Sequence, residues 1–166
     1  MELAIDHIPS PIGTILLVAD DRALYALDFE DTRQRMMELL EQHYGSVQLR
    51  AAKNPGGFSQ KVRDYLDGDL AALDRIPVAM EGTPFQRKVW TRLRKIKCGT
   101  TVSYGELASA IGHPKAVRAV GSTNGRNPVA LVVPCHRVIG ADGSLTGYAG
   151  GLSRKRWLLR HEGLEV

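Results

Sequence analysis

The chain has 166 residues, of which 24% are charged and 43% hydrophobic, and its formal net charge is +4. This composition excludes a disordered chain and predicts a globular protein of one large or two small domains. The longest apolar run falls far short of the roughly 20 residues of a membrane span, the N-terminus lacks the pattern of a signal peptide, and two cysteines cannot form a disulfide framework. We therefore expect a cytoplasmic protein without membrane association.

The charges are unevenly divided along the chain. Residues 1–82 carry 8 Lys/Arg and 14 Asp/Glu, a net charge of −6, whereas residues 83–166 carry 14 and 4, a net charge of +10. Such segregation is typical of a polyanion-binding half joined to an acidic half. The alternative is a solvated basic face that has no partner.

The first domain is expected at residues 1–80. Short apolar runs at 2–8, 14–19 and 23–29 are separated by turns and predict a β-meander. Asp31 is suited to cap a helix that ends before Gly45, and a second short helix is predicted around Val62, with Gly68 as its stop. Nothing in this domain suggests chemistry, so we interpret it as a scaffold.

The second domain is expected at residues 81–166, because the sign of the charge changes between Arg75 and Gly82. Capping boxes begin helices at Thr83 and at Ser103, and the second of these helices should end at Gly112. A third helix is predicted from Lys115 to about residue 124. Two short helices joined by a tight turn indicate a helix-turn-helix, a pattern that core helix pairs also produce.

The third helix combines basic and small side chains. Lys115 and Arg118 are suited to hold phosphates, while Ala119, Gly121 and Ser122 would let the helix backbone approach a groove closely. This set of residues is unusual for a helix buried in a core. It favours contact with nucleic acid.

A cysteine follows the apolar segment 129–133, which we expect to be a strand. Cys135 lies beside His136 and Arg137, and a neighbouring base and cation favour the thiolate, the nucleophilic form. A buried structural cysteine next to a surface histidine is the alternative. Cys98 lies at the end of a predicted helix and is not expected to react.

Several motifs of the basic half together resemble the O6-alkylguanine-DNA alkyltransferases, in their short bacterial form. These motifs are Pro-Cys-His-Arg-Val at 134–138, Arg-Ala-Val-Gly at 118–121, Asn-Pro at 127–128 and Gly-Tyr-Ala-Gly-Gly at 147–151. The resemblance implies a mixed α/β (α+β) fold. Its first part would be a ribonuclease-H-like small sheet with helices, and its second a mainly helical domain with a helix-turn-helix.

The resemblance also implies a reaction. Cys135 would take the alkyl group from O6 of guanine in DNA and keep it as a thioether, so that each molecule works once. His136 would act through a water as general base, and Glu162 would orient that histidine. Activity on O4-alkylthymine stays open. No metal and no organic cofactor are implied.

Further site residues are carried over from the family. Tyr104 would donate to N3 of guanine, and Asn127 would brace the active-site turn. The carbonyls of Cys135 and Val138 would accept from the guanine amino group. The remaining pocket residues implied are Tyr148, Ala149 and Gly150. Packing on Trp90 for Tyr104, and a surface position for Glu162, are the structural alternatives.

The resemblance implies double-stranded DNA as the partner, contacted in the minor groove with the alkylated base flipped out. Arg118 would fill the gap in the base stack, and Lys115 would contact a phosphate. Helix residues implied to face the DNA are Ala119, Gly121, Ser122 and Thr123. We expect a monomer; cooperative binding stays open. The competing function is that of a non-catalytic lesion-binding protein, and a transcription factor is a weaker competitor.

Overall fold

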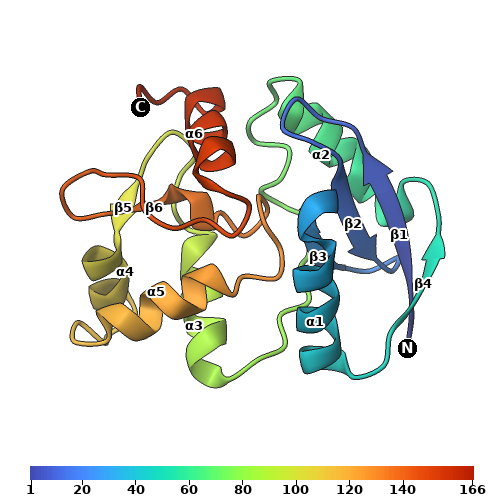
Figure 1. Ribbon diagram of the computed structural model, residues 1–166, viewed down its shortest axis with the longest axis horizontal. Coiled ribbons are helices and arrows are strands. Elements are labelled where there is room, and N and C mark those ends of the chain that lie inside the picture. Colours follow the sequence, from blue (N-terminus) through green and yellow to red (C-terminus); the bar gives the residue numbers. More distant parts are fainter. The chain divides into compact units, whose positions relative to one another are not determined.

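The computed structural model describes residues 1–166 and divides into two compact units (Figure 1). The first comprises Met1–Glu81 and Pro128–Val132, and the second comprises Gly82–Asn127 and Val133–Val166. The division at Glu81 coincides with the change in the sign of the charge. The segment Pro128–Val132, which the sequence analysis assigned to the second domain, belongs to the first unit.

A four-stranded sheet forms the centre of the first unit. Its strands are β1 (Glu2–Ile8), β2 (Ile15–Ala19), β3 (Leu24–Phe29) and β4 (Gln48–Ala51), in the order β3-β2-β1-β4. The β1–β2 and β2–β3 pairs are antiparallel, which confirms the predicted meander, and β1–β4 is parallel. Every residue of β2 is buried. A strand buried on both faces needs the continuous apolar run that this segment has.

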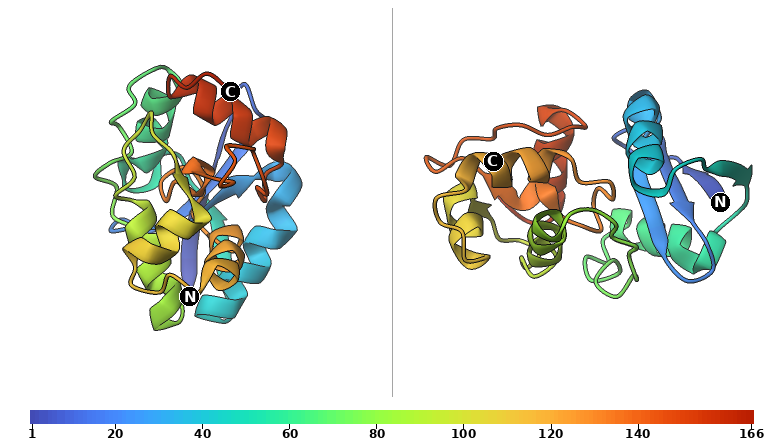
Figure 2. Two further views of the ribbon diagram at one scale, coloured as in Figure 1. Left: turned by 90° about the vertical axis from the view of Figure 1, so that its left-hand side faces the viewer. Right: turned by 90° about the horizontal axis from the view of Figure 1, so that it is seen from below.

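Two helices cover the sheet. Met36 and Leu40 of α1 (Arg33–Tyr44) pack on Leu3, Leu16 and other residues of one face. The shorter α2 (Phe58–Leu66) contacts β1 and lies on the opposite side of the sheet (Figure 2). Short 3-10 helices, Glu30–Thr32 and Pro55–Gly57, precede α1 and α2. Asp31 lies inside the first of these, so it does not cap α1; Thr32 occupies that position.

The apolar segment 129–133 is not a strand, contrary to the sequence prediction. Val129 makes an isolated parallel bridge with Leu27 of β3, where Leu27 donates to the Pro128 carbonyl and accepts from Ala130 N–H. The chain then turns at Leu131, whose φ is 68°. A positive φ in a non-glycine residue ends any extended pairing. Val129 and Ala130 thus lie against the β3 edge at Leu27 without forming a new strand.

The second unit is mainly helical. Its helices are α3 (Pro84–Leu93), α4 (Tyr104–Ala110), α5 (Val117–Gly125) and α6 (Leu152–His161), joined by the two-residue parallel strands β5 (Val102–Ser103) and β6 (Val138–Ile139) and a 3-10 turn, η3 (Cys135–Arg137). Both predicted capping boxes are present: Gln86 N–H donates to Thr83, and Glu106 N–H donates to Ser103. No helix is long and apolar enough to cross a membrane.

The α4–α5 pair forms the expected helix-turn-helix, but the end of α4 and the start of α5 differ from the predicted positions. Helix α4 stops at Ala110, and Gly112 follows with a φ of 80°. Helix α5 begins only at Val117, so Lys115 lies in the turn before it. The Ala116 N–H donates to the His113 carbonyl and closes that turn. The predicted start at Lys115 was therefore two residues too early.

Candidate active site

Cys135 begins the 3-10 turn η3, and its residue is only 7% exposed. Pro134 precedes it, and Arg137 N–H donates to the Pro134 carbonyl at 3.0 Å. The Val138 N–H closes the turn by donating to the Cys135 carbonyl. These two hydrogen bonds fix the backbone of the turn. The side chains of Cys135 and His136 therefore project from a backbone whose position is fixed.

His136 and Arg137 both bind the carboxylate of Glu162, the C-cap residue that directly follows α6. His136 Nε2 is 2.8 Å from Oε2, and Arg137 donates from Nε to Oε1 at 2.8 Å and from Nη2 to Oε2 at 3.0 Å. Arg137 Nη1 also donates to the Ile96 carbonyl at 2.7 Å. All three side chains are buried. The Arg137 guanidinium is therefore paired with the Glu162 carboxylate.

The protonation states of this cluster follow from its geometry. Burial would raise the pKa of Glu162, but the hydrogen bonds and charges of His136 and Arg137 outweigh it and hold that pKa far below its usual 4.5. Burial keeps the pKa of His136 below 6.5, although Glu162 acts to raise it. The carboxylate is thus ionised and the imidazole neutral at neutral pH. Because an ionised carboxylate only accepts, Nε2 carries the proton and Nδ1 is the acceptor.

The other nitrogen of His136 is available for chemistry. Nδ1 is buried and has no hydrogen-bond partner within the protein. A buried acceptor without a partner costs free energy unless a ligand or water satisfies it. Next to Cys135 in the same turn, this atom is suited to accept a proton from a thiol, directly or through one water.

Two asparagines hold the segment around the cysteine. Asn127 is 2% exposed and its Nδ2 donates to the Val133 carbonyl at 2.7 Å. Asn124, on α5, donates from Nδ2 to the Cys135 carbonyl at 3.4 Å. The position of Asn127 agrees with a bracing role. Asn124 was not among the predicted site residues, and its bond ties α5 to the nucleophile's backbone.

A buried lysine on α6 holds the far side of the site. Lys155 is fully buried, and its Nζ donates to the carbonyls of Val138 at 2.6 Å, Thr146 at 2.8 Å and Gly147 at 3.2 Å. Burial lowers the pKa of Lys155 to about 8, against the opposing attraction of Cys135. Lys155 was not among the predicted site residues, because its α6 neighbours Arg154 and Arg156 are basic as well and nothing in the sequence distinguishes it from them.

Tyr104 lies between α5 and the loop that leads to α6. Its hydroxyl donates to the Thr146 carbonyl at 3.1 Å, and a Cβ added to Gly121 would lie 3.7 Å from its ring. The Tyr104 ring therefore lies next to α5 at Gly121, at a distance where one added carbon would make ordinary van der Waals contact. Tyr104 therefore lies beside the loop that leads to α6; its predicted bond to N3 of guanine stays a prediction.

The loop itself carries the remaining predicted pocket residues. Tyr148 and Gly150 are half-buried and Ala149 is exposed. The Gly151 N–H donates to the Tyr148 carbonyl at 2.8 Å, which makes a turn just before α6. Val138 is buried, and its carbonyl is one of those that Lys155 holds. Because a carbonyl oxygen has two lone pairs, it can still accept from a ligand.

The predicted DNA-facing residues divide between two sides of α5. Arg118, Ala119 and Ser122 are exposed, Lys115 is exposed in the preceding turn, and Gly121 is half-buried. Thr123 is 6% exposed and its carbonyl accepts from Trp90 Nε1 at 3.0 Å. Thr123 therefore belongs to the face packed on α3 and is removed from the set of exposed residues.

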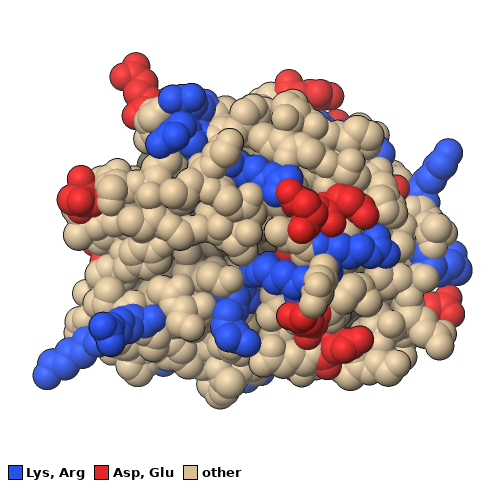
Figure 3. Space-filling model, in the orientation of Figure 1, with Lys and Arg blue, Asp and Glu red and all other residues tan.

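The surface around these elements carries few charges. On the face in Figure 3, a broad area of the second unit shows no Lys, Arg, Asp or Glu, and side chains of both charges stand at its margins. No group of three His, Cys, Asp or Glu side chains is arranged to hold a metal ion. Cys98 is half-buried and forms no disulfide with Cys135.

Fold and site together define a two-unit protein whose helix-turn-helix unit carries a cysteine beside a His–Glu pair. Residues 84–164 match the family described as 6-O-methylguanine DNA methyltransferase, DNA binding domain, and residues 5–80 match 6-O-methylguanine DNA methyltransferase, ribonuclease-like domain. The chain belongs to the 6-O-methylguanine DNA methyltransferase family.

Relatives match along nearly the whole chain. The methylated-DNA–protein-cysteine methyltransferase of Salmonella typhimurium is 51% identical over 166 residues, covering 98% of this chain and 97% of the relative. The protein of that name from Methanosarcina acetivorans is 45% identical, covering 93% and 94%.

Solved structures support the fold. The Mycobacterium tuberculosis OGT in complex with DNA superposes with a TM-score of 0.79 at 37% identity, covering 98% of this chain and 92% of that one. The O6-methylguanine-DNA methyltransferase of Pyrococcus kodakaraensis gives a TM-score of 0.77 at 30% identity, covering 98% and 99%. The expected mixed α/β fold is confirmed.

Proposed function

We propose that this protein repairs O6-alkylguanine in double-stranded DNA by moving the alkyl group to its own Cys135. The observation that carries the proposal is the buried chain of contacts from the Cys135 turn through His136 to Glu162. The names of the relatives, which are methylated-DNA–protein-cysteine methyltransferases, support the same substrate. The cytoplasm is the expected location.

The proposed step is a displacement at the alkyl carbon. The Cys135 thiol gives its proton to His136 Nδ1, directly or through a water, and Sγ then forms a bond to the alkyl carbon as the bond to guanine O6 breaks. The electron pair of that bond goes to guanine, which is restored when it takes up a proton. Glu162 holds the imidazole in the required tautomer. Because the thioether is stable, one molecule removes one alkyl group.

The base would be held by the residues around the turn. The carbonyls of Cys135 and Val138 would accept from the guanine amino group, and Ala149 N–H would face O6. Tyr104 would exchange its bond to Thr146 for one to N3 of the base. Tyr148 and Gly150 would form the wall of the pocket.

The DNA would lie on the exposed side of α5. A base inside a duplex must be flipped out to reach a protein pocket. Arg118 would fill the space in the stack, Lys115 would contact a phosphate, and the small residues Ala119, Gly121 and Ser122 would permit close approach in the minor groove.

Mass spectrometry tests the proposal. The protein is incubated with a duplex that holds one O6-methylguanine, and the intact mass and the Cys135 peptide are measured. We expect one added methyl on Cys135, saturating at one equivalent. Cys98→Ser should behave like the unchanged protein, and Cys135→Ser should gain no methyl. Tight binding of the duplex without any mass change would overturn alkyl transfer in favour of lesion binding.

A further inference from the structure

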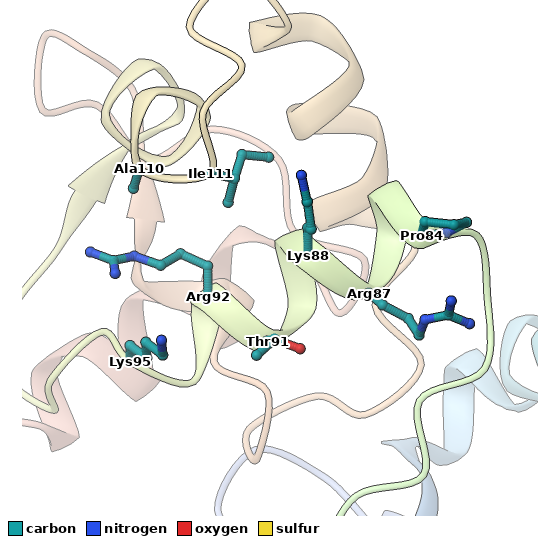
Figure 4. A pocket seen from close by; sticks show the side chains of 8 residues that line it. All are labelled: Pro84, Arg87, Lys88, Thr91, Arg92, Lys95, Ala110 and Ile111. Atoms are coloured by element: carbon teal, nitrogen blue, oxygen red, sulfur yellow. The ribbon is translucent and has the colours of Figure 1, made fainter.

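The segment between α3 and β5 lies beside the proposed active site. It begins after α3, where Figure 4 shows Lys95 beyond the last helical turn. It ends at β5, whose two residues pair in parallel with β6, directly after the cysteine turn η3. No residue of this segment was among the predicted site residues. Its contacts with the site nevertheless reach both partners of the buried Arg137–Glu162 pair.

The contact with Arg137 is a hydrogen bond. Arg137 Nη1 donates to the Ile96 carbonyl at 2.7 Å, while Nε and Nη2 donate to the Glu162 carboxylate. Ile96 is only 7% exposed, so this bond is shielded from water. The main chain at Ile96 is therefore part of the buried cluster that contains His136.

The contact with Glu162 is made at Gly99. A Cβ atom built on Gly99 would lie 3.2 Å from the carbonyl oxygen of Glu162, which is closer than ordinary van der Waals contact. The Glu162 main chain would have to give way by a few tenths of an ångström. Because Gly99 has no side chain, the turn lies directly against the residue that follows α6.

The turn that contains Gly99 is held by its own hydrogen bonds. Thr100 donates to the Lys97 carbonyl twice, from its N–H at 3.1 Å and from Oγ1 at 2.7 Å. Gly99 is the third residue of this four-residue turn and has a φ of 81°. A positive φ at the third residue, with none at the second, is typical of a type II turn and favours glycine there. Since these bonds fix the turn, the displacement that a new Cβ causes falls on Glu162.

A displacement of Glu162 would reach His136. The carboxylate oxygen Oε2 is 2.8 Å from His136 Nε2, and both side chains are fully buried. This bond holds the proton on Nε2 and leaves Nδ1 as the acceptor. Hydrogen bonds to ionised groups are strongest at about 2.7–2.9 Å, so a longer distance weakens this one. The imidazole would then also populate the other tautomer, in which Nδ1 carries the proton and cannot accept one.

We propose that Gly99 is a positioning residue for alkyl transfer. It places the main chain of Glu162, and through Glu162 it fixes the tautomer of His136. The proposal rests on the proposed function in taking His136 as the base that receives the Cys135 proton. It goes further because it extends the arrangement of the reacting groups to a glycine that carries no functional group of its own.

Two variants and a matched control separate contact from backbone strain. Gly99→Ala adds a Cβ and strains the turn, whereas Gly99→Asn adds the Cβ with less strain, because asparagine tolerates a positive φ. The control is Gly112→Ala in the same unit: the φ of Gly112 is 80°, and a Cβ there would meet no atom within 4 Å. All rates are measured at a temperature at which thermal unfolding shows each variant to be folded. Should Gly99→Ala fail to fold, Gly99→Asn still tests the contact.

The rate of reaction with free O6-benzylguanine is the first readout. Both Gly99 variants should lower the maximal rate by roughly three- to tenfold, because a misplacement of about 1 Å can cost about a hundredfold. The concentration that gives half the maximal rate should stay the same, since Gly99 does not touch the base. Gly112→Ala should react like the unchanged protein. A normal rate in Gly99→Asn would overturn the proposal, because strain of the turn would then explain any loss in Gly99→Ala.

The ring nitrogens of His136 give a second readout, which a purely structural role of Gly99 would not change. In protein with 15N-labelled histidine, the chemical shifts of Nδ1 and Nε2 report which nitrogen holds the proton. Nε2 should hold it in the unchanged protein and in Gly112→Ala, whereas in both Gly99 variants the two shifts should move towards each other. Unchanged shifts would overturn the proposal even if the rate fell, because the loss would then not pass through Glu162.

Failure of this proposal and failure of the proposed function are distinguishable. Methyl transfer to Cys135 is measured by mass spectrometry on the unchanged protein, and the nitrogen shifts are measured without any alkylated substrate. If the unchanged protein transferred no methyl, the proposed function would be overturned, and the shifts would still show whether Gly99 places Glu162. If transfer occurred and the shifts of the Gly99 variants were unchanged, only the role of Gly99 would be overturned.

Discussion

At the scale of single residues, the charge of Glu162 is shared between two partners. Arg137 takes two of the carboxylate's hydrogen bonds, and His136 takes one. Since the guanidinium is permanently charged, it balances the carboxylate, and the imidazole can stay neutral. An imidazole facing a carboxylate alone would be drawn towards protonation. Arg137 therefore keeps His136 in the form that accepts a proton.

Removing the charge of Glu162 should destabilise the protein. In Glu162→Gln the Arg137 guanidinium is left buried without a counter-charge, which typically costs about 3–5 kcal/mol. Urea unfolding at neutral pH measures the loss. The exposed Arg50–Glu2 pair is the matched control, because Glu2→Gln should cost less than about 1 kcal/mol. If Glu162→Gln lowered the free energy of unfolding by less than about 1 kcal/mol, that would contradict a fully buried Arg137–Glu162 pair.

The same pair should shape acid unfolding. Because the pKa of Glu162 is lower in the folded protein than its usual 4.5, its stabilising contribution is complete above that value. It is lost as the pH falls through the folded pKa. Stability of the unchanged protein should thus decline below about pH 4.5, and Glu162→Gln should show a shallower decline. Equal slopes in urea unfolding at acid pH would contradict this.

The reaction rate should persist to lower pH than an ordinary histidine allows. Burial holds the pKa of His136 below 6.5, so its neutral form still dominates at that pH. Single-turnover rates with free O6-benzylguanine, measured from about pH 5 to about pH 8, should show a midpoint below 6.5. A midpoint at or above 6.5 would mean that the imidazole gains its proton more easily than its burial allows.

At the scale of helices and strands, elements that a local sequence motif determines could be predicted, whereas elements that depend on pairing with a distant segment could not. The capping boxes at Thr83 and Ser103 are each complete within four residues, so their helices could be located from sequence. Strand β4, Gln-Leu-Arg-Ala, is largely exposed and polar and exists through its pairing with β1. Val129 and Ala130 of the apolar segment 129–133 pair with Leu27 of β3 and form no strand of their own. The spacing of apolar residues in the sequence predicts neither the pairing of β4 with β1 nor the place of this segment beside β3.

Gly121 should tolerate one methyl group and no more. A Cβ there would make ordinary contact with the Tyr104 ring at 3.7 Å. Gly121→Ala should raise stability by up to about 1 kcal/mol, because alanine favours helix over glycine. Gly121→Leu should push Tyr104 away from α5 and slow the reaction with O6-benzylguanine. Thermal unfolding and the reaction rate check both variants, and an unaffected Leu variant would contradict the contact.

Lys155 should hold the loop before α6. Lys155→Met removes a donor from three carbonyls, and the buried one, that of Val138, costs about 1–3 kcal/mol when it is left without a partner. Hydrogen exchange of amides 147–151 should accelerate, while amides of β2 should keep their rates. Unchanged exchange in the loop would mean that other contacts hold it.

At the scale of the whole molecule, the site could be only partly predicted. Cys135, His136 and Glu162 were predicted from the family resemblance, and the structure places the His136 and Glu162 side chains in contact. The contacts of Asn124, Arg137 and Lys155 join segments that are 11 to 41 residues apart in sequence. Only the packing of α5 and α6 around the turn determines these pairs, and a single sequence does not encode that packing in any local pattern.

Alkylation should destabilise the second unit. Cys135 is 7% exposed, and its carbonyl is bonded to Asn124 on α5. Adding a methyl group to a well-packed interior costs about 1–3 kcal/mol, which lowers Tm by about 2–4 °C per kcal/mol in a chain of this size. Calorimetry of the free and methylated proteins measures the difference. Equal Tm values would show that the pocket holds the methyl without strain.

The placement of the tryptophans has an optical consequence. The chain has two, Trp90 and Trp157, and both lie in the second unit. Trp90 is fully buried and bonded to α5, and Trp157 stacks on His161 with ring centroids 4.7 Å apart. Intrinsic indole fluorescence therefore originates only from the unit that carries Cys135. A shift of α5 changes the surroundings of Trp90, so unlabelled protein reports it as a change in emission, while the first unit is visible only through its tyrosines.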